Sequence, residues 1–286
     1  MSTNQSLQLK IKKFDIRCMS RDATICIIGK RRTGKSVLLK DIMYNFRYIP
    51  KGCVFCATEG CNPYFRHFVP DMYISQEYNS SLLQKIFRKQ GEIINRDGGK
   101  NDKNNIFLIM DDMLADAQSW KKDRQIRELF LNGRHRNIFV LLTMQFVLGI
   151  TPDLRTNLDY IFIFKENILS NRKRIYENFA GFIPNFATFS KIMDQCTEDY
   201  ACLVVNNNTN SNKLEDNIFW YKAEPDLPKF RCGNKSFWKL HDQCYKENDD
   251  EDDEIDMTNN ILQQYGGKSK GVRVIVRKEQ SSDTFS

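Results

Sequence analysis

Residues 24–36 read Thr24-Ile25-Cys26-Ile27-Ile28-Gly29-Lys30-Arg31-Arg32-Thr33-Gly34-Lys35-Ser36, and they carry the strongest structural signal in the chain. Its first five residues are largely apolar and β-branched, which is typical of a buried strand. The other eight fit the phosphate-binding loop G-x-x-x-x-G-K-[ST] at every constrained position. Apolar residues then recur at helical spacing from Val37 to Phe46. The sequence therefore predicts a strand, a phosphate loop and a helix whose N-terminus faces the phosphates.

Each residue type in this loop has a physical role in binding a nucleotide. The glycines let the backbone wrap closely, so that successive N–H groups point at negative oxygens. Lys35 is placed to reach the β- and γ-phosphates, and the Ser36 hydroxyl is placed to hold Mg²⁺. We therefore expect ATP and Mg²⁺ as ligands. The residues expected to contact the nucleotide are Gly29, Lys30, Arg31, Arg32, Thr33, Gly34, Lys35 and Ser36.

Length and composition favour one sizeable core. The chain has 286 residues, of which 41% are hydrophobic, and no apolar run approaches the 18 residues that a membrane span needs. The N-terminus is polar, so we expect neither a transmembrane helix nor a signal peptide. The nine cysteines are odd in number and scattered, and an ATP-binding loop belongs in a reducing compartment. We therefore expect free thiols.

The charge is distributed unevenly along the chain. Residues 1–246 carry 38 Lys and Arg against 26 Asp and Glu, a net +12, which is compatible with a polyanionic partner such as DNA or with a solvated basic surface. Residues 247–256 hold eight carboxylates, too many like charges to pack together. We expect a basic segment over 1–20, an ATPase domain over 21–245 and a disordered acidic tail over 246–286.

Short apolar runs alternate with helical patterns along the rest of the chain. Such runs are typical of strands buried on both faces, so we expect an α/β fold with a mainly parallel central sheet flanked by helices. The further strands predicted are 53–57, 106–110, 138–144, 160–164, 201–205 and 219–221. The further helices predicted lie near 81–94, 171–179 and 186–195.

Polar residues follow two of these strands and supply the second half of a hydrolytic site. Asp111 and Asp112 end one strand, where the first is placed to hold Mg²⁺ and the second to orient or deprotonate an attacking water. Gln145 ends the next strand, where its amide could sense the γ-phosphate. The alternative for all three is a solvated strand end. Together with the phosphate loop, they favour a motor-type ATPase over a small-molecule kinase.

Further segments resemble the poxvirus-type genome-packaging ATPases of large nucleocytoplasmic DNA viruses. These segments are Gly29–Ser36, the strand with Asp111-Asp112, 132–137, 149–160, 171–174, 176–181, 212–216 and 219–221. The resemblance spans roughly residues 20–240. It implies an FtsK–HerA-like P-loop NTPase with a RecA-like strand arrangement, in which an extra strand separates the phosphate-loop strand from the Asp-bearing strand.

The resemblance also implies an activity and a set of partners. The family forms homo-oligomeric rings that push double-stranded DNA into a capsid by ATP hydrolysis, so sequence-independent DNA contact and capsid or portal-like viral proteins are expected. It places the protein at viral assembly sites in the host cytoplasm, with retention in the virion left open.

Residue roles carry over from the same resemblance. Lys35 and Ser36 correspond to the phosphate and Mg²⁺ ligands, Asp111 to the Mg²⁺ carboxylate, Asp112 to the catalytic carboxylate and Gln145 to the sensor. Related motors often have glutamate at the second carboxylate, and here the side chain is shorter.

A ring motor usually needs an arginine from the neighbouring subunit to neutralise the transferring phosphate. Arg134 and Arg155 are the candidates, because both lie in family-like segments close to strand ends. Either one could instead form an internal ion pair or contact DNA.

Two other functions remain open. One is a phosphate-loop kinase of a nucleoside or small metabolite, with Arg172, Lys173 and Arg174 as phosphate clamps. The other is a non-catalytic DNA-binding or assembly protein that binds nucleotide as a switch.

Overall fold

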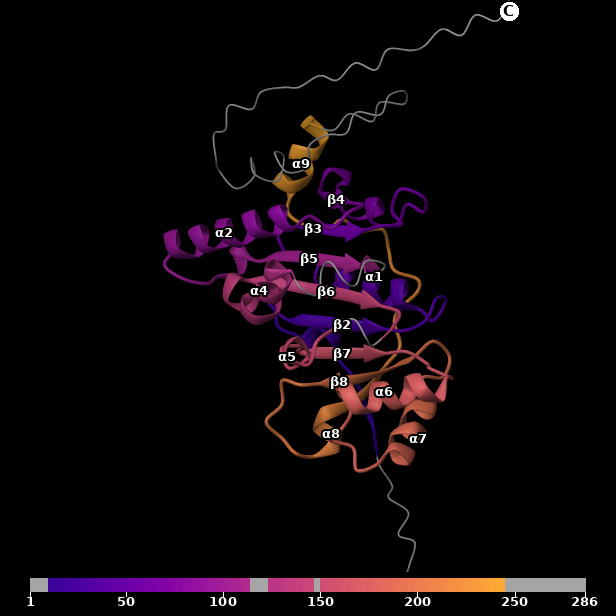
Figure 1. Ribbon diagram of the computed structural model, residues 1–286. Coiled ribbons are helices and arrows are strands. Elements are labelled where there is room, and N and C mark those ends of the chain that lie inside the picture. The colour runs from indigo at the N-terminus through magenta and orange to yellow at the C-terminus, as the bar shows by residue number, and fades with distance from the viewer. Residues whose placement is uncertain (1–9, 114–122, 147–149, 245–286) are drawn as a thin grey trace, which may run out of the picture.

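The computed structural model describes residues 10–113, 123–146 and 150–244, and these residues build one nine-stranded sheet with helices on both faces (Figure 1). The strand order is β1-β9-β8-β7-β2-β6-β5-β3-β4. The strands are β1 (Lys12–Lys13), β2 (Thr24–Ile28), β3 (Lys51–Cys56), β4 (Ile74–Ser75), β5 (Ile106–Asp111), β6 (Ile138–Met144), β7 (Tyr160–Ile163), β8 (Cys202–Asn206) and β9 (Ile218–Tyr221).

The phosphate-loop strand β2 lies in the middle of the sheet. It pairs in parallel with β6 on one side, where Ile25 is opposite Leu141, and with β7 on the other, where Ile25 is opposite Tyr160. Strand β6 also pairs in parallel with β5. One strand therefore separates β2 from the Asp-bearing strand, which confirms the expected strand arrangement. Among the described strands, β8 alone runs antiparallel to its neighbours.

Helices cover both faces of this sheet, with α1 on one face and α4, α5 and α6 on the other (Figure 1). The α-helices are α1 (Lys35–Asn45), α2 (Ser80–Arg96), α4 (Arg124–Asn132), α5 (Pro152–Arg155), α6 (Leu169–Phe179), α7 (Phe186–Cys196), α8 (Leu214–Asn217) and α9 (Lys235–Cys244). The 3₁₀ turns are η1 (Ile16–Cys18), η2 (Phe65–His67), η3 (Asp71–Tyr73), η4 (Asp102–Asn104) and η6 (Arg134–Arg136). No helix among the described residues is both long and apolar enough to cross a bilayer.

Apolar runs located the inner strands well. Strands β2 and β6 have the predicted bounds, and the other predicted strands are shifted by one or two residues. Strands β1 and β4 were not predicted, because two residues are too short to show any periodicity. Helix α4 was also missed, although Asp123 caps it by accepting hydrogen bonds from two backbone N–H groups, and Ile126, Leu129 and Phe130 recur at helical spacing.

The segment ahead of the phosphate-loop strand belongs to the folded body from Lys10 onward. Strand β1 pairs in parallel with β9, and the side chains of Phe14, Ile16 and Met19 are buried in the common core. A boundary at residue 20 therefore cuts through the packed structure. The expected acidic tail over 246–286 lies outside the described residues.

Residues 222–234 form a strap that lies across α1 and leads into α9. The buried Asp41 of α1 accepts hydrogen bonds from the Tyr221 hydroxyl at 2.7 Å and the Glu224 N–H at 3.0 Å. Farther along, the Phe230 ring packs against Tyr44 and Phe68. The strap thus holds α1, and with it the phosphate loop, against the sheet.

We expect Phe237→Ala to destabilise the whole domain. The Phe237 ring is fully buried and stacks on Tyr73 with 4.3 Å between ring centroids. Removing a buried phenyl ring costs about 3–5 kcal/mol, whereas Leu131→Ala, at a side chain that is 45% exposed, should stay within about 0.5 kcal/mol. Urea unfolding of both variants measures this difference. Equal midpoints would show that α9 is not part of the cooperative unit.

Candidate active site at the carboxyl edge of the sheet

The phosphate loop joins the carboxyl end of β2 to the first turn of α1. Lys35 is the first residue of α1, its side chain is buried, and its Nζ donates hydrogen bonds to the backbone oxygens of Gly29 at 2.7 Å and Lys30 at 3.0 Å. Burial lowers the pKa of Lys35, and the nearby Asp112 and Asp111 carboxylates oppose that shift. The ammonium group is thus held inside the loop that is to receive the phosphates.

Two glycines of the loop are required by close packing. A Cβ on Gly29 would lie 2.6 Å from Thr33 Oγ1 and 2.8 Å from Phe164 Cβ, closer than atoms can approach. Gly34 has φ 107°, in the left-handed region, and lies against the Phe164 ring. Glycine is therefore needed at these two positions for a second reason, besides letting the backbone approach the phosphates. The Phe164 side chain, which follows β7, fills the space that a side chain there would occupy.

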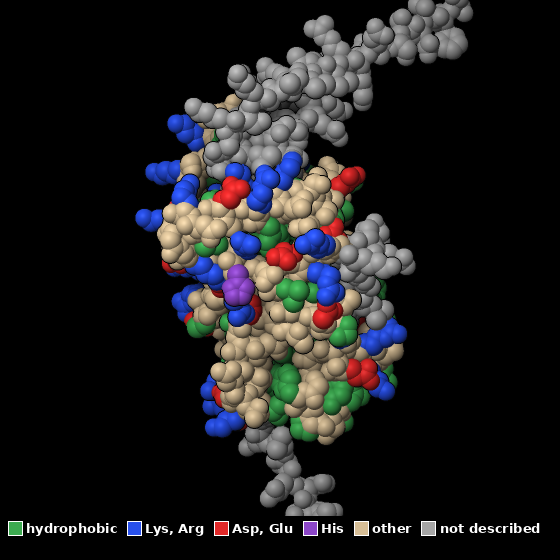
Figure 2. Space-filling view, turned by 60° about the vertical axis from the view of Figure 1, so that its left-hand side comes forward, with side chains coloured by type: hydrophobic (Ala, Val, Ile, Leu, Met, Phe, Trp, Pro, Cys, Tyr) green, Lys and Arg blue, Asp and Glu red, His purple; other side chains and the backbone are tan. Residues whose placement is uncertain are grey.

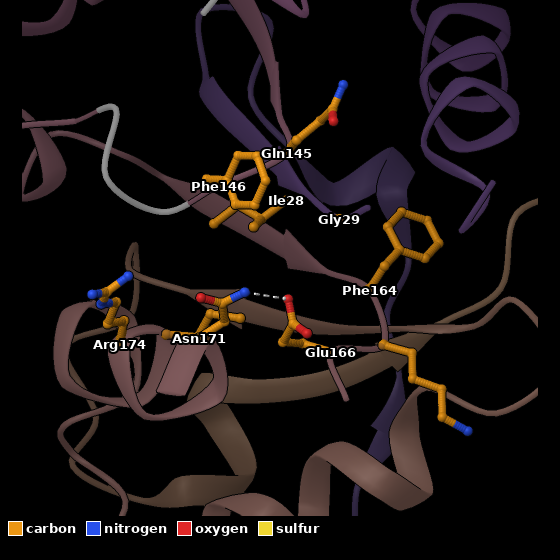
Figure 3. Close-up of a pocket in the computed structure, with 10 residues that line it drawn as sticks. Ile28, Gly29, Gln145, Phe146, Phe164, Glu166, Asn171 and Arg174 are labelled. Atoms are coloured by element: carbon orange, nitrogen blue, oxygen red, sulfur yellow. Dashed lines mark hydrogen bonds between the residues drawn. The ribbon is translucent and has the colours of Figure 1, made fainter. Parts of the chain in front are cut away.

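The loop is also tied to the start of α6 through a buried carboxylate. Glu166 accepts a hydrogen bond from the Lys30 ammonium at 2.6 Å in an ion pair, and another from the Asn171 amide at 3.3 Å. Its remaining partner is the backbone N–H of Ile168. Figure 3 shows Glu166 and Asn171 on the floor of a pocket that reaches Gly29 and Gln145, while the Gln145 side chain points away from α6.

A buried threonine connects the two predicted aspartates. The Thr143 hydroxyl, on β6, donates a hydrogen bond to Asp111 Oδ1 at 2.6 Å and accepts one from the Asp112 N–H at 3.0 Å. Asp112 has φ 47°, a conformation that turns the chain sharply after β5. Burial raises the pKa of Asp111, the hydrogen bond from Thr143 opposes that shift, and the neighbouring Asp112 charge adds to it.

Gln145 lies beside the second aspartate. Its amide Nε2 donates a hydrogen bond to Asp112 Oδ2 at 2.8 Å. Thr143 lies on β6, and Gln145 directly follows the last residue of that strand. The structure therefore brings Asp111, Asp112 and Gln145 together at the edge that carries the phosphate loop.

The donor set at this edge fits Mg²⁺. The Asp111 carboxylate and the exposed Ser36 hydroxyl provide hard oxygen ligands. No cluster of three or more His, Cys, Asp or Glu that could hold a metal occurs among the described residues. Mg²⁺ usually binds through one or two carboxylates together with phosphate oxygens and water, so such a cluster is not required.

A loop after β3 supports the first turn of α1 at Ser36. The Tyr64 hydroxyl donates a hydrogen bond to the Ser36 backbone oxygen at 2.6 Å. The loop itself is held by Glu59, whose buried carboxylate accepts bonds of 3.0 Å from the N–H groups of Tyr64, Phe65 and Arg66. Three convergent N–H groups satisfy a buried charge that would otherwise be costly.

The two candidate arginines lie at the opposite edge of the sheet. Arg134 forms an ion pair with the buried Asp159, which also accepts a 2.7 Å hydrogen bond from the N–H of Thr24 at the start of β2. Arg155 ends α5, beside the start of β7 (Figure 1), and its buried Nε has no hydrogen-bond partner. Burial lowers the pKa of Arg155. Neither arginine lies at its own phosphate loop.

The three basic residues of α6, Arg172, Lys173 and Arg174, differ in whether an acidic side chain pairs with them. Arg172 is held by Asp194 at 2.8 Å and by the Glu166 backbone oxygen, and Lys173 lies 3.9 Å from Glu177. Arg174 is exposed and lines the pocket of Figure 3. Of the three side chains predicted as phosphate clamps, Arg172 is therefore paired with a carboxylate of α7 and Lys173 with a carboxylate of α6 itself.

Sequence reasoning missed Thr143, Glu166, Glu59 and Tyr64 as supporting residues. Thr143 could have been found, because it is a polar residue inside an otherwise apolar strand and lies two positions before Gln145. The others carry no local signal, because their partners lie in elements that only the fold brings near.

The chain is similar to known viral proteins along most of its length. The sequence model of the family described as Poxvirus A32 protein matches residues 11–218. A protein of Acanthamoeba polyphaga mimivirus is 38% identical over 244 residues, 83% of this chain and 85% of the relative. A protein of Invertebrate iridescent virus 3 is 39% identical over 214 residues, 73% of this chain and 80% of the relative.

Solved structures share the fold. The DNA-packaging ATPase B204 of Sulfolobus turreted icosahedral virus has a TM-score of 0.51 and 18% identity, covering 73% of this chain and 100% of that one. The genome packaging NTPase B204 of Sulfolobus turreted icosahedral virus 2, bound to ATP-gammaS, has a TM-score of 0.50, 16% identity and the same coverage. These likenesses confirm the expected fold class.

We expect Thr143→Val to lower nucleotide turnover by about 10- to 100-fold while Thr143→Ser retains most of it. Valine removes the hydroxyl that orients both aspartates, and loss of such a hydrogen bond to a charged group is worth about 1.5–3 kcal/mol. Steady-state phosphate release measures the effect, and thermal unfolding of both variants controls for folding. Wild-type turnover in Thr143→Val would contradict this positioning role.

Proposed function

This chain belongs to the family described as Poxvirus A32 protein, and from this premise we propose that it is the motor that moves viral double-stranded DNA into the capsid by hydrolysing ATP to ADP and phosphate. The observation that carries the proposal is the set of hydrogen bonds that holds Asp111, Asp112, Thr143 and Gln145 together beside the phosphate loop. A nucleotide-binding loop without such a group could bind ATP but would lack residues to activate water.

Each residue then has a defined part in the reaction. Lys35 leaves the loop carbonyls to meet the β- and γ-phosphates, while the loop N–H groups surround them. Ser36 and Asp111 would hold Mg²⁺, which supplies charge neutralisation at the phosphates when bound. Asp112 accepts the proton of the attacking water, and Gln145, bonded to that carboxylate, senses whether the γ-phosphate is present.

DNA contact follows from charge rather than from a base-reading motif. The body of the chain carries the net +12 of residues 1–246. Figure 2 brings the amino edge of the strands toward the viewer, and Lys and Arg side chains are widespread there, with fewer Asp and Glu among them. Such a surface binds phosphates without regard to sequence, and its affinity falls steeply with salt.

The proposed motor works as a homo-oligomeric ring in the host cytoplasm. An arginine at the amino edge can reach a phosphate only if that edge of one subunit lies against the carboxyl edge of the next, as in a head-to-tail ring. The eight cysteines whose side chains are described are free, in keeping with a reducing host cytoplasm, where viral assembly takes place. Capsid or portal-like proteins are the partners that a packaging motor requires.

Long duplex DNA should stimulate ATP hydrolysis by the wild-type protein. Lys35→Ala and Asp112→Asn should each lower turnover by at least about 100-fold, because one removes the phosphate contact and the other the proton acceptor. Phosphate release with and without DNA, alongside mass determination of the oligomer, measures this. Phosphoryl transfer to a metabolite by a monomer would support a kinase instead, and absent turnover in a folded wild-type protein would support a switch.

Subunit mixing tests the arginines. Arg134→Ala or Arg155→Ala subunits retain an intact phosphate loop, whereas Lys35→Ala subunits retain the arginines. If one arginine acts across the interface, its variant should regain turnover when mixed with Lys35→Ala protein, which alone is inactive. Arg127→Ala, which removes an exposed ion pair with Asp153, is the control and should stay active unmixed. No recovery in any mixture would count against a shared site.

A further inference from the structure

The turn between α7 and β8 has an unusual backbone. The Ala201 N–H donates a hydrogen bond to the Glu198 oxygen at 2.8 Å, and the two residues between them have positive φ, 49° at Asp199 and 63° at Tyr200. Aspartate tolerates this conformation, but glycine is the usual residue at the second position, and a bulky side chain there is strained. The chain therefore spends folding free energy to place a tyrosine at this position.

Burial does not compensate for that strain. The Tyr200 side chain is 70% exposed, more than any other large hydrophobic side chain in the described residues. Strained residues of this kind concentrate at ligand-binding sites. An exposed aromatic ring in a strained turn is thus a candidate for binding a ligand rather than for packing.

The turn lies beside the phosphate loop. Since β8 runs antiparallel to β7, the start of β8 and the end of β7 share the carboxyl edge of the sheet. A Cβ on Gly34 would lie 3.8 Å from Tyr200 Cβ, in van der Waals contact, with the Phe164 ring against the same glycine. Tyr200 therefore flanks the first turn of α1, where the phosphates are to bind.

Tyr200 and the residues expected to hydrolyse ATP lie on opposite sides of the phosphate-loop strand β2. Asp111, Asp112 and Gln145 follow β5 and β6, on one side of β2, whereas Tyr200 precedes β8, on the other side, beyond β7. A triphosphate with its γ end toward Asp112 must direct its ribose and base toward β7 and β8. We propose that the Tyr200 ring stacks on the base of the bound nucleotide, an inference that rests on the proposed ATP site.

The ligand class follows from the ring. Stacking needs a flat aromatic base and gives no hydrogen-bond pattern to read, so Tyr200 provides affinity for the base of a nucleotide without selecting its substituents. Phe164 is buried and its ring already packs against Gly29 and Gly34, so Tyr200 is the aromatic side chain open to a ligand here. The base is thus bound by one exposed ring, while the loop binds the phosphates.

The test separates base binding from phosphate binding in the full chain. Isothermal titration measures the affinity for ADP and for inorganic tripolyphosphate, both with Mg²⁺. Tyr200→Ala should weaken ADP binding by roughly 5- to 150-fold and leave tripolyphosphate binding unchanged. Tyr200→Phe should match the wild type. Tyr48→Ala is the matched control, because Tyr48 is 49% exposed and stacks on Arg21, before β2, at the opposite edge.

A stability measurement excludes a folding defect. Tyr200→Gly relieves the backbone strain, so it should raise the thermal midpoint while weakening ADP binding as much as alanine does. Unchanged ADP affinity in Tyr200→Ala would overturn the inference, as would an equal loss of ADP and tripolyphosphate binding, which would show that Tyr200 only shapes the loop. If the wild type bound neither ligand, the proposed ATP site itself would fail.

Discussion

The parallel pairing of β5, β6, β2 and β7 positions every residue of the candidate site. It brings the carboxyl ends of four strands to one edge, so that residues following each strand meet although they are far apart in the chain. The hydroxyl of Thr143 fixes how β5 and β6 align, because it is buried in β6 and is hydrogen-bonded to Asp111, the last residue of β5, and to the N–H of Asp112, which follows it. A shift in register between β5 and β6 would break both hydrogen bonds and move the two carboxylates away from Lys35.

Backbone strain is concentrated at the same edge. Of the five described non-glycine residues with positive φ, four lie there: Arg32, Asp112, Asp199 and Tyr200. Buried carboxylates hold the surrounding segments in place, with Glu166 bonded to Lys30 and Glu59 bonded to three N–H groups. The edge thus combines rigid supports with strained residues that a nucleotide can contact. Such a combination is expected where a site must be formed before its ligand arrives.

The amino edge of the sheet has a different character. It carries exposed basic side chains, and some of them, such as Arg134 with Asp159, are already paired. Since this edge is remote from the phosphate loop of the same subunit, any part it takes in hydrolysis must be across an interface. Contact with DNA and contact between subunits would then use surfaces that are exposed among the described residues.

The sequence was enough to predict the phosphate loop, the apolar strands and the positions of Asp111, Asp112 and Gln145. Each of these depends on local spacing or on polar residues that end a strand. The sequence also indicated the helices near 81–94, 171–179 and 186–195, but not α4 between β5 and β6. Tertiary structure alone decided that Thr143 bridges the aspartates, that Phe164 fills the space beside Gly29 and Gly34, and that Glu166 binds Lys30. It also placed Arg134 and Arg155 at the far edge and Tyr200 beside the loop. Those contacts join residues that are distant in the chain. Sequence periodicity indicates on which face of a strand or helix a residue lies, but not which residue of another element it contacts.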